Sequence, residues 1–245
     1  MPVISKVHPQ ASPGAQAEVE AIQYAISLGQ NHIDTAEIYA NGGAEQIVGS
    51  ATGLLKRDDL FIASKLWKSH MAKGLVRPAV EAMLKRLGTD YLDLLYIHAP
   101  WFDTPWQEAI PQISELIGEG MVRYFGVSNF NAVRLQEVLA LASYPTAANQ
   151  VHYSYMHQQG VTPELMQLCA VHDVGIIAYM PLEQCRTTRS VELADIAQQY
   201  NVTASQVALA WLVDQGVFPI PKALQRAHIE QNAAVLKLGP FFQRS

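Results

Sequence analysis

Two apolar runs, LFIASKL at residues 60–66 and LDLLYIHA at residues 92–99, decide the fold class. Both are apolar nearly throughout, which is typical of parallel strands covered on both faces. Five further runs share this character: HIDTA (32–36), VRYFGVS (122–128), TAANQVHY (146–153), GIIAYM (175–180) and VFPIPK (217–222). Segments of helical period separate the runs, so the sequence predicts a repeated strand–helix pattern.

The segments between the runs carry helix signals. Val19, Ile22 and Ile26 recur at the spacing of one helix face, and Thr203 with Gln206 has the spacing of a capping box. The longest interval between strands contains two helix patterns, 190–200 and 203–215, instead of one. This regularity favours one (β/α)8 barrel of the TIM type, a single domain over residues 1–245, rather than an open sheet.

The first strand of this barrel is weak or rebuilt. Only the stretch from Pro2 to Val7 is available for it before the first helix. Eight strands therefore require this short stretch to pair.

The composition excludes several classes of partner. The chain has 49% hydrophobic and 16% charged residues and a net charge of −5, without a basic stripe for nucleic acid or an anionic membrane. Cys169 and Cys185 lack CxxC spacing and nearby paired histidines, so neither a disulfide framework nor a zinc site is indicated. No apolar run has the length of a membrane span, and the start MPVISKVHPQ lacks the core of a signal peptide. We expect a cytoplasmic protein.

Polar side chains stand at or just after the ends of the predicted strands. In a (β/α)8 barrel these positions converge on one face, where active sites lie. The residues concerned are Asp34, Tyr39, Lys65, His98, Ser128, Asn129, Gln150, Tyr179 and Lys222.

Taken singly, most of these residues have ordinary structural explanations: a turn cap for Asp34, a helix cap for Ser128, a core position for His98. Lys65 is the exception, because a lysine at the end of an apolar run needs a partner such as Asp34. No HExxH or HxH cluster, GxSxG elbow or glycine-rich phosphate loop occurs. The sequence thus gives no sign of a metal site, a serine hydrolase or a P-loop enzyme.

Seven motifs taken in order resemble the aldo-keto reductase family from about residue 18 to residue 238: HIDTAEIY, IASKLW, DLLYIHAP, GVSNF, NQVHYS, IAYMPL and IPKALQRAHIEQN. The resemblance implies reduction of an aldehyde or ketone by a nicotinamide cofactor, with a catalytic tetrad of Asp34, Tyr39, Lys65 and His98. Tyr39 would donate the proton, and a cation at Lys65 would stabilise the resulting phenolate.

The same resemblance implies the remaining site. NADP(H) is the expected cofactor, with NAD(H) as the alternative, and a small-molecule carbonyl is the expected partner of a monomeric protein. Trp67 and Trp101, with Phe102 and Trp106, would wall the substrate pocket. The implied cofactor-binding residues are Ser128, Asn129, Gln150, Tyr179, Met180, Leu182, Lys222, Ala223, His228, Gln231 and Asn232.

The chain departs from the family pattern at three places. The glycine-rich first strand is not recognisable in MPVISKVHPQ. Ala223 stands where Ser or Thr is frequent and His228 where Arg is frequent, which weakens two contacts to a 2′-phosphate, although Lys222 with Arg226 nearby still favours NADP(H). The chain ends at GPFFQRS, soon after the last helix pattern, so we expect an open substrate pocket. We expect small reactive carbonyls as substrates because the chain resembles most the shorter, bacterial-type members, the diketogluconate and methylglyoxal reductases.

Two alternatives remain at this stage. One is a regulatory barrel that binds nucleotide with little turnover. The other is an isomerase or lyase that uses Lys65 for a Schiff base.

Overall fold

Seven parallel strands form the centre of the molecule and follow one another in sequence order across the sheet. In the computed structural model, which describes residues 13–238, they are β1 (His32–Asp34), β2 (Phe61–Leu66), β3 (Leu92–Ile97), β4 (Val122–Ser128), β5 (Thr146–His152), β6 (Gly175–Tyr179) and β7 (Phe218–Pro219). Each neighbouring pair is parallel. The seven predicted strands are confirmed, whereas the predicted strand from Pro2 to Val7 lies outside the described residues.

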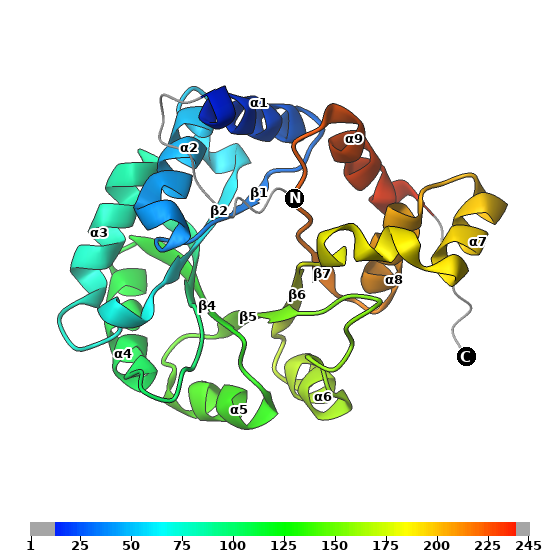
Figure 1. Cartoon of the computed structure of the whole chain (residues 1–245). Coiled ribbons are helices and arrows are strands. Elements are labelled where there is room, and N and C mark those ends of the chain that lie inside the picture. Colours follow the sequence, from blue (N-terminus) through cyan, green and yellow to red (C-terminus); the bar gives the residue numbers. More distant parts are fainter. Residues whose placement is uncertain (1–12, 239–245) are drawn as a thin grey trace.

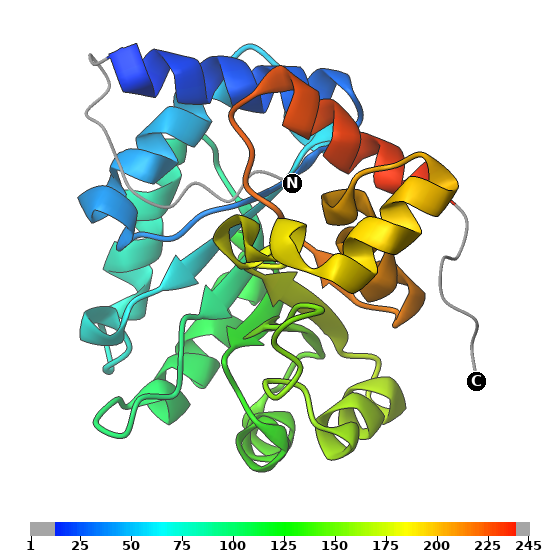
Figure 2. The ribbon, with the colours of Figure 1, turned by 45° about the vertical axis from the view of Figure 1, so that its right-hand side comes forward.

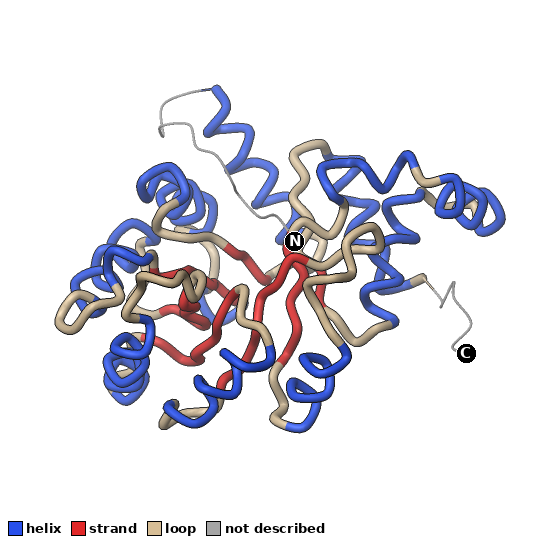
Figure 3. Tube along the Cα trace, turned by 60° about the horizontal axis from the view of Figure 1, so that its bottom comes forward, coloured by secondary structure: helices blue, strands red, loops and turns tan. Residues whose placement is uncertain are grey.

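Helices surround the strands on the outside, as Figures 1 and 3 show. They are α1 (Pro13–Ser27), α2 (Gly43–Thr52), α3 (Val76–Leu87), α4 (Trp106–Gly118), α5 (Ala132–Leu141), α6 (Pro163–Val171), α7 (Val191–Tyr200), α8 (Ala204–Asp214) and α9 (Arg226–Ala234). The 3-10 helices within residues 13–238 are η1 (Tyr39–Gly42), η2 (Arg57–Asp59), η3 (Lys68–His70), η4 (Glu183–Arg189) and η5 (Val235–Lys237). Between residues 13 and 238, no helix combines the length and apolar character needed to cross a membrane.

The strands curl into a barrel with one seam, between β7 and β1. Within the described residues, β7 pairs with β6 but not with β1. The ring of His32 in β1 stacks on that of Phe218 in β7, with centroids 5.4 Å apart. Helices α1 and α9 lie side by side outside this seam (Figures 1 and 2). The His32–Phe218 ring contact and the α1–α9 helix pair therefore connect the β1 and β7 edges of the sheet.

The alternation of side chains along the strands separates two apolar layers. One set faces the surrounding helices and includes Ile62, Leu95 and Val127. The other set fills the barrel interior and consists of Ala63, Leu94, Tyr96, Ala148, Ile177 and Ile220. The next inward-facing residues, two positions further along these strands, lie at the open end of the barrel.

The predicted capping box opens α8. The Thr203 side chain accepts a hydrogen bond from the Gln206 backbone N–H at 3.2 Å, and the Gln206 side chain accepts one from the Thr203 backbone N–H at 3.0 Å. Both satisfy backbone donors that the first turn of a helix leaves free. The local sequence thus fixes where this helix begins.

Gly126 in β4 makes room for the interior ring of Tyr96. A Cβ at position 126 would lie 2.8 Å from Tyr96 Cε1 and 3.0 Å from the Ala148 carbonyl oxygen. Backbone on one side and a fully buried ring on the other leave no space for it. This glycine allows a large aromatic residue to lie directly beneath the site.

Candidate active site

Strand alternation places three polar side chains at the same end of the barrel interior. Lys65, Gln150 and Tyr179 each follow an interior residue of their own strand by two positions. Because successive inward residues point the same way, these side chains lie directly above the apolar interior layer.

Lys65 and Asp34 form a fully buried ion pair. Lys65 is 1% exposed and Asp34 is 0% exposed, and the ammonium donates to Asp34 Oδ1. Lys65 Nζ also donates to the Thr35 carbonyl oxygen at 2.8 Å, and Gln150 Nε2 donates to Asp34 Oδ2 at 2.8 Å. Both carboxylate oxygens are therefore occupied.

The pair keeps Lys65 charged. Burial lowers the pKa of Lys65, but the Asp34 carboxylate and the neighbouring Tyr39 outweigh it, so the pKa lies above its usual value. Lys65 is accordingly a cation at neutral pH.

Tyr39 approaches this cation from η1. Lys65 Nζ lies 5.2 Å from the centroid of the Tyr39 ring. The chain turns sharply after the tyrosine, with Ala40 and Asn41 at φ 51° and 55°. This turn leaves Tyr39 at the mouth of the barrel, half-buried, with its ring lining the pocket.

His98 follows β3 and is held neutral. Burial, with the nearby charge of Lys65, lowers the pKa of His98 to about 3. Its ring meets that of Tyr39 edge-on, with centroids 5.8 Å apart. His98 Nδ1 is buried and has no hydrogen-bond partner among residues 13–238. A neutral imidazole of this kind offers one donor and one acceptor.

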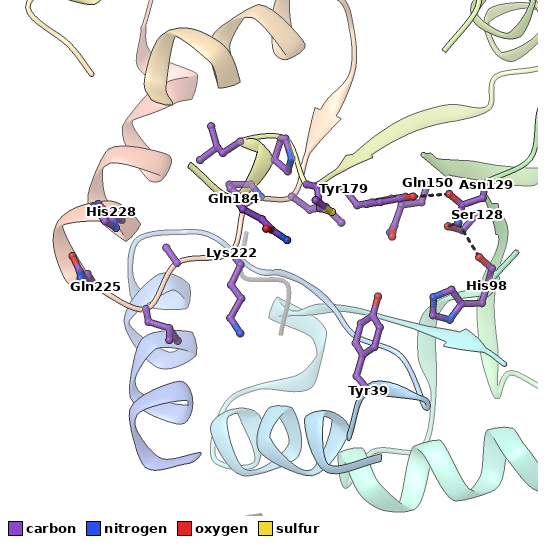
Figure 4. A pocket seen from close by; sticks show the side chains of 17 residues that line it. Tyr39, His98, Ser128, Asn129, Gln150, Tyr179, Gln184, Lys222, Gln225 and His228 are labelled. Carbon is purple, nitrogen blue, oxygen red and sulfur yellow. Dashed lines mark hydrogen bonds between the residues drawn. The ribbon is translucent and has the colours of Figure 1, made fainter. Parts of the chain in front are cut away.

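A pocket of about 670 Å³ joins these groups to the far side of the barrel mouth (Figure 4). Tyr39 and His98 lie at one end of it in the view, and His228 lies at the other. The residues that line it are Tyr39, His98, Ser128, Asn129, Gln150, Tyr179, Met180, Pro181, Leu182, Gln184, Ile220, Pro221, Lys222, Ala223, Leu224, Gln225 and His228. Ends of strands β3 to β7 thus contribute to a single cavity.

Asn129 organises the polar centre of the pocket. Its Nδ2 donates to Ser128 Oγ at 3.0 Å and to the His98 carbonyl oxygen at 3.2 Å. Its Oδ1 accepts from the Tyr179 hydroxyl at 2.8 Å. The residue adopts a left-handed backbone, with φ 64°. One amide therefore connects the ends of three strands.

The family follows from comparison with known proteins. The model of the "Aldo/keto reductase family" matches residues 9–244. The chain belongs to the aldo/keto reductase family. Methylglyoxal reductase YeaE of Escherichia coli is 40% identical over 232 residues, which cover 91% of this chain and 80% of the relative. Glyoxal reductase of Bacillus subtilis is 34% identical over 216 residues, covering 88% of this chain and 76% of the relative.

A solved structure agrees with this assignment. The crystal structure of an aldo/keto reductase from Klebsiella pneumoniae in complex with NADP and acetate has a TM-score of 0.88 to this chain. It is 35% identical, and the match covers 96% of this chain and 86% of that chain. The expected barrel of the aldo/keto reductases is confirmed.

Most of the predicted cofactor-binding residues of this aldo/keto reductase line the pocket of about 670 Å³, but two do not. Gln231 and Asn232 lie on α9, outside the pocket lining. The Gln231 carbonyl oxygen accepts from Gln206 Nε2 at 3.2 Å, and Asn232 lines a second cavity of about 350 Å³ beside β7.

Two of the aromatic residues predicted to wall the substrate pocket, Trp67 and Trp101, lie near His98, but neither is among the residues that line the pocket of about 670 Å³. Trp67 stacks edge-on against His98 with centroids 5.1 Å apart, and Trp101 lies 4.6 Å from Trp67. The prediction for Trp106 was wrong: it is 2% exposed at the start of α4 and packs on Phe130 in the core. Phe102 is fully exposed to solvent, so it does not wall the pocket either.

Sequence reasoning missed Glu37, which holds the loop after β2. The Glu37 carboxylate is buried and accepts from the backbone N–H of Trp67 and, at 2.8 Å, from His70 Nδ1. Its position two residues before Tyr39 in the HIDTAEIY motif was the available signal. Gln184 in η4 and Gln225, directly before α9, also line the pocket, but neither belongs to an apolar run or a helix pattern that the sequence shows.

Proposed function

We propose that this protein reduces a small aldehyde or ketone to an alcohol with NADPH, and that Tyr39 donates the proton. The observation that carries the proposal is the buried Lys65–Asp34 pair beside Tyr39 at the end of a pocket long enough to reach Lys222. Family membership and the NADP named in the Klebsiella structure support the choice of cofactor.

The residues of the pocket fit a nicotinamide nucleotide. At its polar centre, Ser128, Asn129 and Gln150 supply hydroxyl and amide groups that match a carboxamide. Tyr179 offers an aromatic face, and Lys222 offers a cation for phosphate. Bound there, the nucleotide supplies a hydride.

The tetrad residues allow Tyr39 to donate its proton to the carbonyl oxygen. A tyrosine hydroxyl has a usual pKa near 10, so releasing its proton at neutral pH calls for a stabilised phenolate. Lys65 supplies positive charge in a water-excluded setting, where an electrostatic interaction is stronger than in water. Asp34 keeps that lysine charged and in place. A neutral His98 donates a hydrogen bond to the carbonyl oxygen and orients it toward Tyr39.

Small reactive dicarbonyls are the proposed substrate class. The relatives whose names state a substrate include methylglyoxal reductase and glyoxal reductase. Trp67 and Trp101 gather around His98 and would offer flat apolar surface to a short substrate.

The geometry disfavours a Schiff base at Lys65. Its nitrogen is buried and engaged by Asp34 and Thr35, and its raised pKa keeps it protonated. A Schiff-base lysine must instead be neutral and reachable.

Turnover separates the reductase from a regulatory nucleotide-binding barrel. We expect purified protein to consume NADPH with methylglyoxal, and Tyr39→Phe to lower kcat by about 10²-fold or more. Binding of NADP⁺ should survive in this variant, because it loses only a hydroxyl. Tight NADP⁺ binding without turnover by the wild type, across methylglyoxal, glyoxal and keto-sugar acids, would support the regulatory alternative.

We propose further that the protein acts as a monomer in the cytoplasm. The buried, free Cys169 thiol is consistent with a reducing compartment. Light scattering after size-exclusion chromatography should give a mass near 27.0 kDa.

A further inference from the structure

A buried carboxylate of α1 lies beside the cation of the pocket. Glu18 is 5% exposed, and its Oε1 lies 3.4 Å from Lys222 Nζ, although 204 residues separate the two in sequence. Figure 4 shows Lys222 on the segment that leads to α9, on the side of the pocket where Gln225 and His228 lie. The lysine thus carries a counter-charge before any nucleotide binds.

The second oxygen of this carboxylate lacks a partner. Glu18 Oε2 is buried and forms no hydrogen bond to any residue of the range 13–238. Buried polar atoms are usually satisfied. Glu18 is not itself among the lining residues, but it contacts Lys222, which lines the pocket, so its unsatisfied oxygen is a candidate acceptor for a ligand bound beside Lys222. A hydroxyl group is the donor that matches a carboxylate oxygen without adding charge.

The two nicotinamide nucleotides differ in this chemistry. NADPH carries a phosphate monoester on the 2′ position of its adenosine ribose, with a charge of about −1.5 to −2 at neutral pH. NADH has a neutral hydroxyl there. In dinucleotide-binding proteins, a carboxylate near this position accepts from the hydroxyl, whereas a cationic side chain accommodates the phosphate. In this protein Lys222 supplies the cation and Glu18 supplies the carboxylate, and the two side chains are in contact.

Few other groups at this end favour phosphate. Ala223 has no side-chain donor. The Arg226 guanidinium lies over the ring of Tyr24, 4.4 Å from its centroid, and the Tyr24 hydroxyl donates to Glu230. Gln225 and His228 also line this end, but among the described residues of the pocket lining Lys222 is the only lysine or arginine. The carboxylate paired with Lys222 should therefore affect phosphate binding directly.

We propose that Glu18 determines the nucleotide preference of this reductase. Its negative charge repels a 2′-phosphate that Lys222 attracts, and its carboxylate oxygen accepts a hydrogen bond from a 2′-hydroxyl. Glu18 therefore reduces the preference for NADPH and allows NADH to bind. This inference rests on the proposed function, since it assigns a role to Glu18 within the same nucleotide pocket.

Titration calorimetry with NADP⁺ and NAD⁺ tests the proposal on Glu18→Gln. The variant keeps the shape of the side chain and removes its charge. We expect the ratio of the Kd for NAD⁺ to the Kd for NADP⁺ to rise about tenfold, mainly through tighter NADP⁺ binding. The fragments 2′,5′-ADP and 5′-AMP should show the same change without the nicotinamide, which locates it at the adenosine end.

Glu20→Gln is the matched control, because Glu20 lies on the exposed face of α1 and loses the same charge. It should leave the ratio unchanged. Glu18→Ala serves as the second variant in case the new amide disturbs α1, and it should raise the ratio in the same direction. A salt titration adds a readout, since the gain in NADP⁺ affinity should shrink at high ionic strength.

The two failures are distinguishable. A ratio within about twofold of the wild type in folded Glu18→Gln and Glu18→Ala would overturn the inference and leave Glu18 as an anchor between α1 and the segment before α9. Wild-type protein that binds neither nucleotide would instead overturn the proposed function. Turnover with NADPH and an unchanged ratio would refute only the role of Glu18.

Discussion

Replacing Asp34 by Asn tests whether the buried ion pair is charged and whether it supports the reaction. Asp34 and Lys65 are 0% and 1% exposed, so solvent does not screen the pair. Removal of one partner from a buried pair destabilises by about 3–5 kcal/mol, against at most about 1 kcal/mol for an exposed pair. The new amide would still accept from Lys65, but its NH₂ group would face the Gln150 donor.

Thermal unfolding followed by circular dichroism measures this cost. For a chain of this size, about 3–5 kcal/mol corresponds to a fall in Tm of roughly 6–20 °C. Glu119→Gln is the control, because it removes one charge from the exposed Arg77–Glu119 pair, whose side chains are 40% and 49% exposed. A variant Asp34→Asn no less stable than this control would refute the account of a buried, charged pair.

The loss of stability in Asp34→Asn should depend on pH. In the wild type the raised pKa of Lys65 stabilises the folded state below the unfolded pKa of about 10.4, and this stabilisation disappears as pH rises through the folded pKa. Without Asp34, burial dominates and lowers the pKa of Lys65. The stability difference between wild type and variant should thus be largest at neutral pH and shrink toward alkaline pH. The kcat of the variant should also fall, and should recover in part at lower pH as Lys65 regains its proton.

Two further predictions concern His98 and Gly126. Because the pKa of His98 in the folded state is about 3, its ring signals in NMR should not titrate between pH 5 and pH 8. Only the unfolded state takes up this proton, so the free energy of unfolding should fall as pH drops below about 6.5, by on the order of 2 kcal/mol at pH 5. His98→Gln should remove this part of the fall. A normal titration near pH 6.5 would contradict the burial of this imidazole. Gly126→Ala should destabilise the protein by about 1–3 kcal/mol in urea unfolding, because its Cβ would lie 2.8 Å from Tyr96 Cε1; an unchanged midpoint would show that the Tyr96 ring moves freely.

The strands could be predicted from the sequence because they depend on local pattern, whereas the catalytic roles of the tetrad residues came from the resemblance to a family. Continuous apolar runs identify parallel strands, and period-2 alternation brings Lys65, Gln150 and Tyr179 to one end of the barrel. Contacts between segments far apart in the chain leave no pattern in the sequence. The pairing of Glu18 with Lys222 joins α1 to the segment before α9, and no periodicity links the two.

Burial of individual aromatic residues was equally hard to predict. Trp101 and Trp106 stand in one loop sequence, yet only Trp101 lies near His98, because Trp106 begins α4 and turns into the core against Phe130. The direction of a side chain at a helix start depends on the helix it joins, which a short aromatic cluster does not reveal.

The reaction proposed for the pocket at Tyr39 is the transfer of a hydride from nicotinamide to a carbonyl carbon. The most direct measurement uses NADPH deuterated at both hydrogens of the nicotinamide C4, with methylglyoxal as acceptor and NMR of the alcohol product. We expect one deuterium on the new carbinol carbon, and a loss of product with Tyr39→Phe. Product without deuterium, or wild-type protein that forms none while NADPH remains bound, would contradict it.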